Sequence, residues 1–305
     1  MISFRFHLVS VVAVFLALGL GVLSGTTVLN RGIVAQLERQ TERLATDAQE
    51  LRGQVTELQA QADQWGLFGE ELIPYLLDER LEGRAVVLIT QEGTDEAAVA
   101  AVQEMLERAG ASILTLLQIT DRMALPTDVD RQDLATAIGT VRIDEPETLK
   151  ARAAVQLADQ LAFGASEGDV LGRLMDGGFV ANLGRNLGEA QVRELSQADA
   201  VVVVAGGLQV LPPRPERFLI PFVEAAAESG IPLAAAEPLD TVFELVGPLR
   251  SDDAVTARIV TQDNVDQVPG TFGLVLALGD LLDEGRAGHY GVKDRASGVI
   301  PPPSV

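Results

Sequence analysis

The first 65 residues carry two apolar patterns, one after the other. Residues 8–29 are 22 consecutive positions without a charged side chain. A helix of that length rises about 33 Å, close to the roughly 30 Å hydrocarbon core of a bilayer. The pattern predicts a membrane anchor that includes Leu8, Phe15, Leu20 and Leu29, so residues 1–30 form a stub and a single transmembrane helix. A cleaved signal peptide is the alternative, although its apolar part is usually only 7–15 residues long.

The second pattern is a seven-residue repeat over residues 34–65. Its a positions are Val34, Thr41, Ala48, Val55 and Ala62, and its d positions are Leu37, Leu44, Leu51, Leu58 and Trp65. Leucine at four successive d positions favours a parallel coiled coil. We predict a stalk over residues 31–69, ending in a hinge at residues 65–69, and a homodimer seam formed by Val34, Leu37, Leu44, Leu51, Val55, Leu58 and Trp65. The alternatives to a homodimer are a higher oligomer and a single amphipathic helix packed on its own domain.

Residues 70–296 alternate between buried-strand and helix patterns. After a short helix at 70–81, strands are expected at 84–90, 111–119, 200–205, 231–235 and 256–261. Helices are expected at 94–109, within 127–174, and at 215–229, 240–246 and 273–284. Continuous apolar strands that alternate with helices indicate a mostly parallel sheet covered on both faces. The predicted fold class is α/β, with a Rossmann or flavodoxin-like three-layer domain. Residues 297–305 are the proline-rich C-terminal tail, and its last five residues, 301–305, are expected to fray or to act as a polyproline ligand.

Composition excludes several classes of function. The 305-residue chain has a net charge of −21, which argues against nucleic acid as a partner. It has no cysteine, so disulfides, zinc–thiolate sites and thiol nucleophiles are excluded. With two histidines and no nucleophile elbow, we predict that the protein is not an enzyme and has no catalytic residues. Arginines on both sides of the anchor leave its orientation open.

Metal binding has few candidate ligands. Copper prefers cysteine or methionine sulfur as the cuprous ion and imidazole as the cupric ion. The chain offers His7, His289 and the methionines Met105, Met123 and Met175 after the initiator, without a Met-x-x-Met spacing. We therefore expect no cofactor, and His289 is the metal candidate that we retain.

Four stretches resemble the actinobacterial MctB family of named copper transporters. They are residues 1–7 (MISFRFH) before the anchor, residues 261–266 (TQDNVD), Gly270, and residues 288–291 (GHYG). The resemblance marks a family-motif loop of Asp263, Asn264, Asp266, Gly270, His289 and Tyr290. It implies a single-pass cell-membrane protein with an extracytoplasmic C-terminal domain and a role in copper homeostasis or transport. A similar protein, SteB, is associated with the cytoplasmic partner SteA and with septal peptidoglycan hydrolysis.

A single helix encloses no channel, so the residues favour a positional role. We expect a dimeric scaffold that displays its α/β domain to other envelope proteins. The first alternative is a SteB-type regulator of cell separation, with a SteA-like protein or a cell-wall hydrolase as partner. The second is a ligand-binding sensor domain.

Overall fold

The computed structural model describes residues 4–77, 79–142, 144–164, 169–184, 186–188, 191–192, 195, 198–208, 214 and 217–303. The side chains of residues 4–5, 26–35, 70 and 72–74 lie outside this description. The chain divides into two compact units, Met1–Leu67 and Phe68–Val305.

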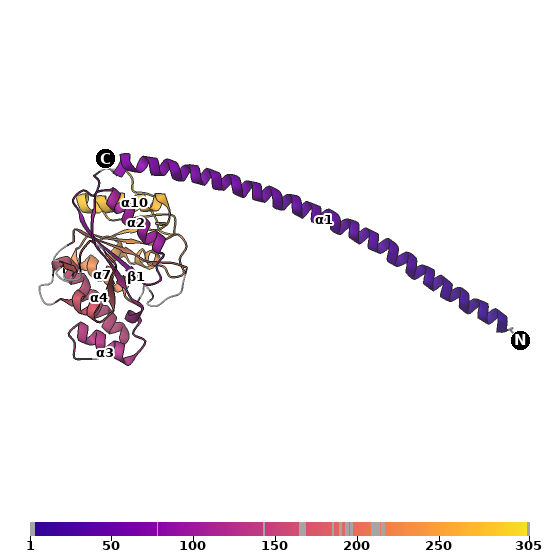
Figure 1. Cartoon of the computed structure of the whole chain (residues 1–305), viewed down its shortest axis with the longest axis horizontal. Coiled ribbons are helices and arrows are strands. Elements are labelled where there is room, and N and C mark those ends of the chain that lie inside the picture. The colour runs from indigo at the N-terminus through magenta and orange to yellow at the C-terminus, as the bar shows by residue number, and fades with distance from the viewer. Residues whose placement is uncertain are drawn as a thin grey trace. The chain divides into compact units, whose positions relative to one another are not determined.

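Helix α1, Phe4–Leu77, is a single helix of 74 residues that carries both N-terminal patterns (Figure 1). The predicted hinge at residues 65–69 is wrong, because the helix continues through Gly66 and Gly69. A glycine inside a helix costs about 1 kcal/mol relative to alanine, which flanking turns can offset. The short helix expected at 70–81 is the last part of α1.

The second unit is built on a seven-stranded sheet. Its strands are β1 Ala85–Gln91, β2 Ser112–Ile119, β3 Val180–Asn182, β4 Ala200–Val204, β5 Leu233–Ala236, β6 Val260–Gln262 and β7 Gly288–Tyr290. The order is β3-β2-β1-β4-β5-β6-β7. All neighbours are parallel except β2 and β3, which are antiparallel. The expected mixed α/β architecture with a mostly parallel sheet and an N-terminal apolar helix is therefore confirmed.

Helices cover both faces of this sheet. They are α2 Glu96–Arg108, η1 Asp121–Ala124, α3 Asp128–Ala137, α4 Pro146–Phe163, α5 Val170–Asp176, α7 Leu219–Ser229, α8 Val246–Leu249, α9 Asp253–Thr256 and α10 Val268–Glu284. One hydrophobic core joins alternate strand residues such as Val87 and Val201 to α3, α4, α5 and α7. The other joins the intervening residues, such as Val86 and Val202, to α2 and α10 (Figure 1).

Several predicted elements are corrected by the structure. The helix expected at 215–229 begins at Leu219, and the helix expected at 273–284 begins earlier, at Val268. The strand expected at 256–261 begins only at Val260, because Thr256 is the last residue of α9, which Asp252 caps. The short helix expected at 240–246 is replaced by turns, and α8 begins at Val246. The helix expected from residue 94 begins at Glu96, because the side chain of Asp95 accepts hydrogen bonds from the backbone of Ala97 and Ala98.

The residues after α1 are fixed to the sheet and to α10. Leu77 and Leu81 are fully buried in the second core. Arg80 pairs with Asp280 of α10, and Arg84 Nη2 lies 2.8 Å from Asp283 Oδ1. The chain then enters β1, which lies in the middle of the sheet.

The tail follows β7 instead of fraying at once. Gly291 N donates to Gly298 O at 2.8 Å, and Ser297 N donates to His289 O at 2.8 Å. Pro301 is buried. The expectation that the tail frays from residue 301 is therefore wrong for Pro301 itself, which is buried where the preceding backbone hydrogen bonds extend the edge of the sheet.

Candidate functional site

The apolar part of α1 is long enough to cross a membrane. Residues Phe6–Gly25 have a mean hydropathy of 2.5, and length and composition alone support this assignment. The anchor residues Leu8, Phe15 and Leu20 are exposed on the helix, as lipid-facing side chains are. Leu29 lies among the residues whose side chains are not described.

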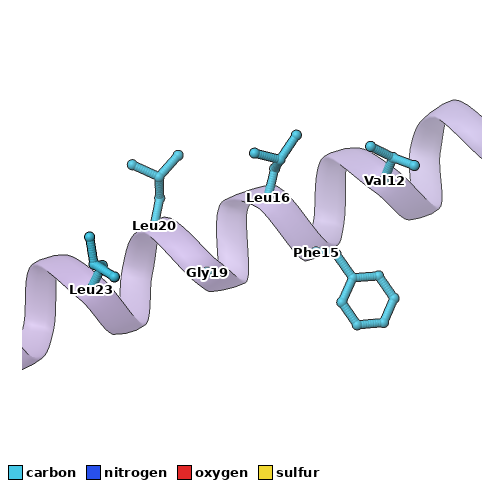
Figure 2. A pocket seen from close by; sticks show the side chains of 6 residues that line it. All are labelled: Val12, Phe15, Leu16, Gly19, Leu20 and Leu23. Atoms are coloured by element: carbon cyan, nitrogen blue, oxygen red, sulfur yellow. The ribbon is translucent and has the colours of Figure 1, made fainter.

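One face of this span is hollowed. The groove is lined by Val12, Phe15, Leu16, Gly19, Leu20 and Leu23. Figure 2 shows Leu16, Leu20 and Leu23 on one side of the ribbon, with Phe15 pointing the other way and Gly19 between them. A Cβ added at Gly19 would meet nothing within 4 Å, so the floor of the groove is open.

The stalk presents its predicted seam as a row of exposed apolar side chains. Leu37, Leu44, Leu51, Val55, Leu58 and Trp65 are each more than half exposed. The side chain of Val34 is not described. The hydroxyls of Thr41, Thr46 and Thr56 donate to the carbonyl four residues earlier. The row is thus an apolar stripe on a helix whose own polar side chains are satisfied locally.

The family-motif residues meet at the carboxyl ends of β5, β6 and β7, around a buried arginine. Arg250 Nη1 lies 2.8 Å from Asp263 Oδ2, and both side chains are almost fully buried. Arg250 also donates from Nε to Thr261 Oγ1 at 2.9 Å and from Nη2 to the Tyr290 carbonyl. Asp263 Oδ1 accepts from Val292 N at 2.6 Å. A buried ion pair with this many hydrogen bonds fixes the geometry of the chain around it.

A second buried pair lies beside the first. Lys293 Nζ donates to Glu237 Oε1 at 2.8 Å, and Glu237 Oε2 accepts from the backbone of Leu245 and Val246 at 2.6 and 3.0 Å. Asp266 Oδ1 accepts from Leu239 N at 2.7 Å. These carboxylates therefore hold the loops after β5 and β6, and each already accepts hydrogen bonds from the protein.

Glycines allow this close packing. A Cβ on Gly291, whose φ is +128°, would lie 2.2 Å from Asp263 Cγ. A Cβ on Gly270 would lie 2.1 Å from the carbonyl oxygen of Asn264, which itself has a φ of 56°. No side chain fits at either glycine without displacing the motif loop.

Both ring nitrogens of His289 are engaged. Nε2 lies 3.1 Å from the carbonyl oxygen of Thr256, which can only accept, so Nε2 carries the proton. Nδ1 lies 2.9 Å from Thr261 Oγ1, which accepts from Arg250 and so donates to the ring. Burial lowers the pKa of His289, and the charge of Arg250 lowers it further, whereas the bond to Thr256 opposes both. The ring is held neutral.

Comparison with known proteins decides the family. The profile described as "Copper transport outer membrane protein, MctB" matches residues 1–301. The chain belongs to the MctB family. Copper transporter MctB of Mycobacterium tuberculosis (strain ATCC 25618 / H37Rv) is 26% identical over 319 residues, covering 98% of this chain and 99% of the relative. Copper transporter MctB of Mycobacterium leprae (strain TN) is 27% identical over 329 residues, covering 99% and 100%.

Because the relatives are named copper transporters, the possible copper ligands of this chain bear on its function. Among the described residues, no group of three or more His, Asp or Glu side chains could hold a metal ion. Met105 is buried in the core under α2 and α10. Met123 is buried in the core on the other face of the sheet, and Met175 packs against that same core. A metal at Nδ1 of His289 would have to displace Thr261 Oγ1, and a metal at Nε2 would have to displace the Thr256 carbonyl.

Sequence reasoning on the MctB motif missed the charged partners of the motif residues. Arg250, Glu237 and Lys293 complete the buried cluster but lie outside the recognised stretches. Lys293 could have been noticed from the sequence, because the chain contains only two lysines and one of them lies next to the recognised stretch 288–291. Arg250 gave no such signal, since most positive charges of the chain are arginines.

The loops after β1 and β4 lie together where strand order reverses, as ligand-binding loops do in such sheets. Asp95 N donates to Gly206 O at 3.0 Å, and a Cβ on Gly207 would lie 2.6 Å from Gly93 O. In this MctB-family chain the two loops are therefore packed against each other.

Proposed function

We propose that this MctB-family chain is a single-pass envelope protein whose span and stalk hold two copies in parallel, with the α/β domain outside the cytoplasm. Its role in copper homeostasis is exercised by presenting that domain to other envelope proteins. The observation that carries the proposal is α1 itself, one unbroken helix that joins the apolar span to the exposed leucine row.

A parallel pair would bury that row. Leucine at successive d positions packs well in two-stranded parallel coils. Asp47 at g of one copy can approach Arg52 at the following e position of the other, and such pairs set orientation. Anchoring both chains in one membrane imposes the same parallel orientation and raises their local concentration.

The donor set shapes the proposed role in copper handling. The relatives are named copper transporters, whereas the described residues of this chain include no group of three or more His, Asp or Glu side chains that could hold a metal ion. The motif residues instead build a charged clasp that fixes the loops after β5, β6 and β7. We infer that the domain acts as a docking body of the doubly wound Rossmann type, which the strand order supports.

The test of the scaffold is a double substitution in the seam. Leu44→Asp with Leu51→Asp should make the detergent-solubilised protein monomeric by light scattering, because four carboxylates in a paired seam would be desolvated. Gln49→Asp with Ala60→Asp adds the same charge on the outward side of the repeat and should leave the dimer intact. A monomeric wild type would refute the scaffold.

The proposed role in copper homeostasis is tested in cells from which the gene for this protein has been deleted. Wild type and the outward-face variant should restore growth at raised copper, and the seam variant should not. Chained cells with unchanged copper tolerance would replace the copper role with control of cell separation, the SteB-type alternative.

A pocket at the edge of the sheet bears on the sensor alternative. It lies beside β2 and is lined by uncharged groups, among them Gln103, Thr115, Gly184 and Asn186. A rise in melting temperature with a neutral sugar or nucleoside, abolished by Asn186→Leu, would favour a ligand-binding role over the scaffold.

The side of the membrane is tested with single cysteines, since the chain has none. Val141 is fully exposed, so Val141→Cys should react with a membrane-impermeant maleimide in intact cells. Ser3→Cys, before the span, should react only after lysis. The reverse pattern would place the domain in the cytoplasm.

A further inference from the structure

The groove in the membrane span continues the register of the stalk. Leu37 is a d position, and 14 residues, two full heptads, separate it from Leu23. Counting back further makes Leu20 an a position, Gly19 a g position and Leu16 a d position. The helix is unbroken over this interval, so the count is not interrupted by a turn or a kink.

The residues that line the groove match the socket of a parallel coiled coil. Each knob inserts into a hole formed by four residues of the facing helix. For a knob at an a position of a parallel pair, these are the preceding d and g residues, the facing a residue and the next d residue. For Leu20 they are Leu16, Gly19, Leu20 and Leu23, and all four line the groove.

We infer that the groove over Gly19 is the socket for Leu20 of a second copy of this chain, so that one left-handed seam runs from the membrane into the stalk. This inference rests on the proposed stalk dimer and extends it into the bilayer. Lipid tails supply no hydrophobic force between helices, so association there depends on close packing, which small residues permit. Gly19 lets the knob approach the backbone, and the leucines around it form the walls (Figure 2).

An alternative helix–helix interface would use the small residues Ala13, Ala17, Gly21 and Gly25. Spacing by four is typical of right-handed pairs that cross at about −40°. Such a crossing would separate the two helices beyond the membrane, whereas a repeat of seven keeps them together in a left-handed supercoil. The register passes through polar Thr27 at a and Asn30 at d between span and stalk, but the helix continues without a break, so the groove keeps one phase with the leucine row and is favoured over the small-residue stripe.

Single-cysteine cross-linking of the full-length protein in its membrane tests the inference, because the cysteine-free chain contributes no other thiol. Leu16→Cys and Leu20→Cys should form dimers with a short, membrane-permeant bis-maleimide several-fold more readily than Val14→Cys and Leu18→Cys. Leu44→Cys reports the stalk in the same experiment. Cross-linking at residue 44 with no preference for 16 and 20 over 14 and 18 overturns the socket and leaves the stalk dimer standing. Cross-linking at 16 and 20 without 44 would show that the two spans pair but overturns the single seam that continues into the stalk, and with it the stalk dimer.

Filling the socket gives a matched second test. Gly19→Leu should reduce cross-linking through Leu16→Cys several-fold, since the added side chain occupies the space that the knob needs. Gly21→Leu makes the same change two residues away, off the groove, and should leave cross-linking unchanged. Loss caused by Gly21→Leu alone would assign the interface to the small-residue stripe and overturn the inference.

Discussion

At the scale of single residues, the paired charges around Asp263 matter most for stability. Arg250 and Asp263 are almost completely removed from solvent and face each other at 2.8 Å. Replacing one partner leaves the other charge buried without compensation, which costs about 3–5 kcal/mol. The motif aspartate therefore depends on an arginine that lies outside the motif.

Arg250→Met should lower the free energy of unfolding in urea by about 3–5 kcal/mol, because the Asp263 carboxylate stays buried. Arg108→Met is the control. Its guanidinium pairs with Glu104 at 3.3 Å on an exposed helix face, where such a pair contributes about 0.3–0.5 kcal/mol. Equal losses for the two variants would contradict the view that the cluster holds the loops.

His289 should make stability depend on pH. Its pKa is lowered in the folded protein, so between that value and the unfolded value of 6.5 the unfolded chain binds more protons. Its contribution is fully present above pH 6.5 and is lost as pH falls, with a slope of at most about 1.4 kcal/mol per pH unit.

The measurement is the free energy of unfolding at several pH values between 5.5 and 7.5. His289→Gln should flatten the wild-type curve, whereas His7→Gln, which removes the other histidine, should not. A curve unchanged by His289→Gln would show that the ring takes up no extra proton on unfolding.

At the scale of elements, α1 is the part whose stability is easiest to raise. Gly53 lies at an f position, and an added Cβ meets nothing within 4 Å. Gly53→Ala should stabilise the helix by about 1 kcal/mol and raise its melting temperature in circular dichroism without changing the oligomer. Ala60→Gly, also at f, should lower it by a similar amount. A change of oligomeric state in either variant would contradict the assigned register.

The long elements could be predicted from the sequence, and the short ones could not. β1 and β4 are runs of buried apolar residues, so pattern alone located them, whereas α4 was predicted only as part of a helical region within 127–174. β3 and β7 have three residues each, and their neighbours in the sheet hold them in place. Their backbone hydrogen bonds join segments about 30–65 residues apart, a separation that no local pattern encodes.

The same limit applies to the motif cluster. The recognised stretches include Asp263 and His289, but not what those side chains bind. The hinge was predicted from Gly66 and Gly69, and the helix passes through both, because local propensity is a weak determinant in a helix of 74 residues.

At the scale of the whole molecule, copper chemistry separates the rival roles. After incubation with copper and gel filtration, the full-length wild type and His289→Gln should retain the same amount of metal by mass spectrometry. The physical reason is that the ring nitrogens of His289 are engaged by Thr256 and Thr261. Loss of one copper per chain in the variant alone would make His289 a ligand and restore direct transport as the leading role.

The attachment of α1 determines how the molecule would respond to force. Arg80 pairs with Asp280 of α10, Leu81 is buried, and the chain passes directly into the interior strand β1, which β2 and β4 flank on either side. Tension applied through α1 would pull on β1 along its length. It would therefore shear the hydrogen bonds from β1 to β2 and from β1 to β4 at the same time, instead of peeling an edge strand from the sheet. A tether built this way keeps the domain folded while its anchor is pulled.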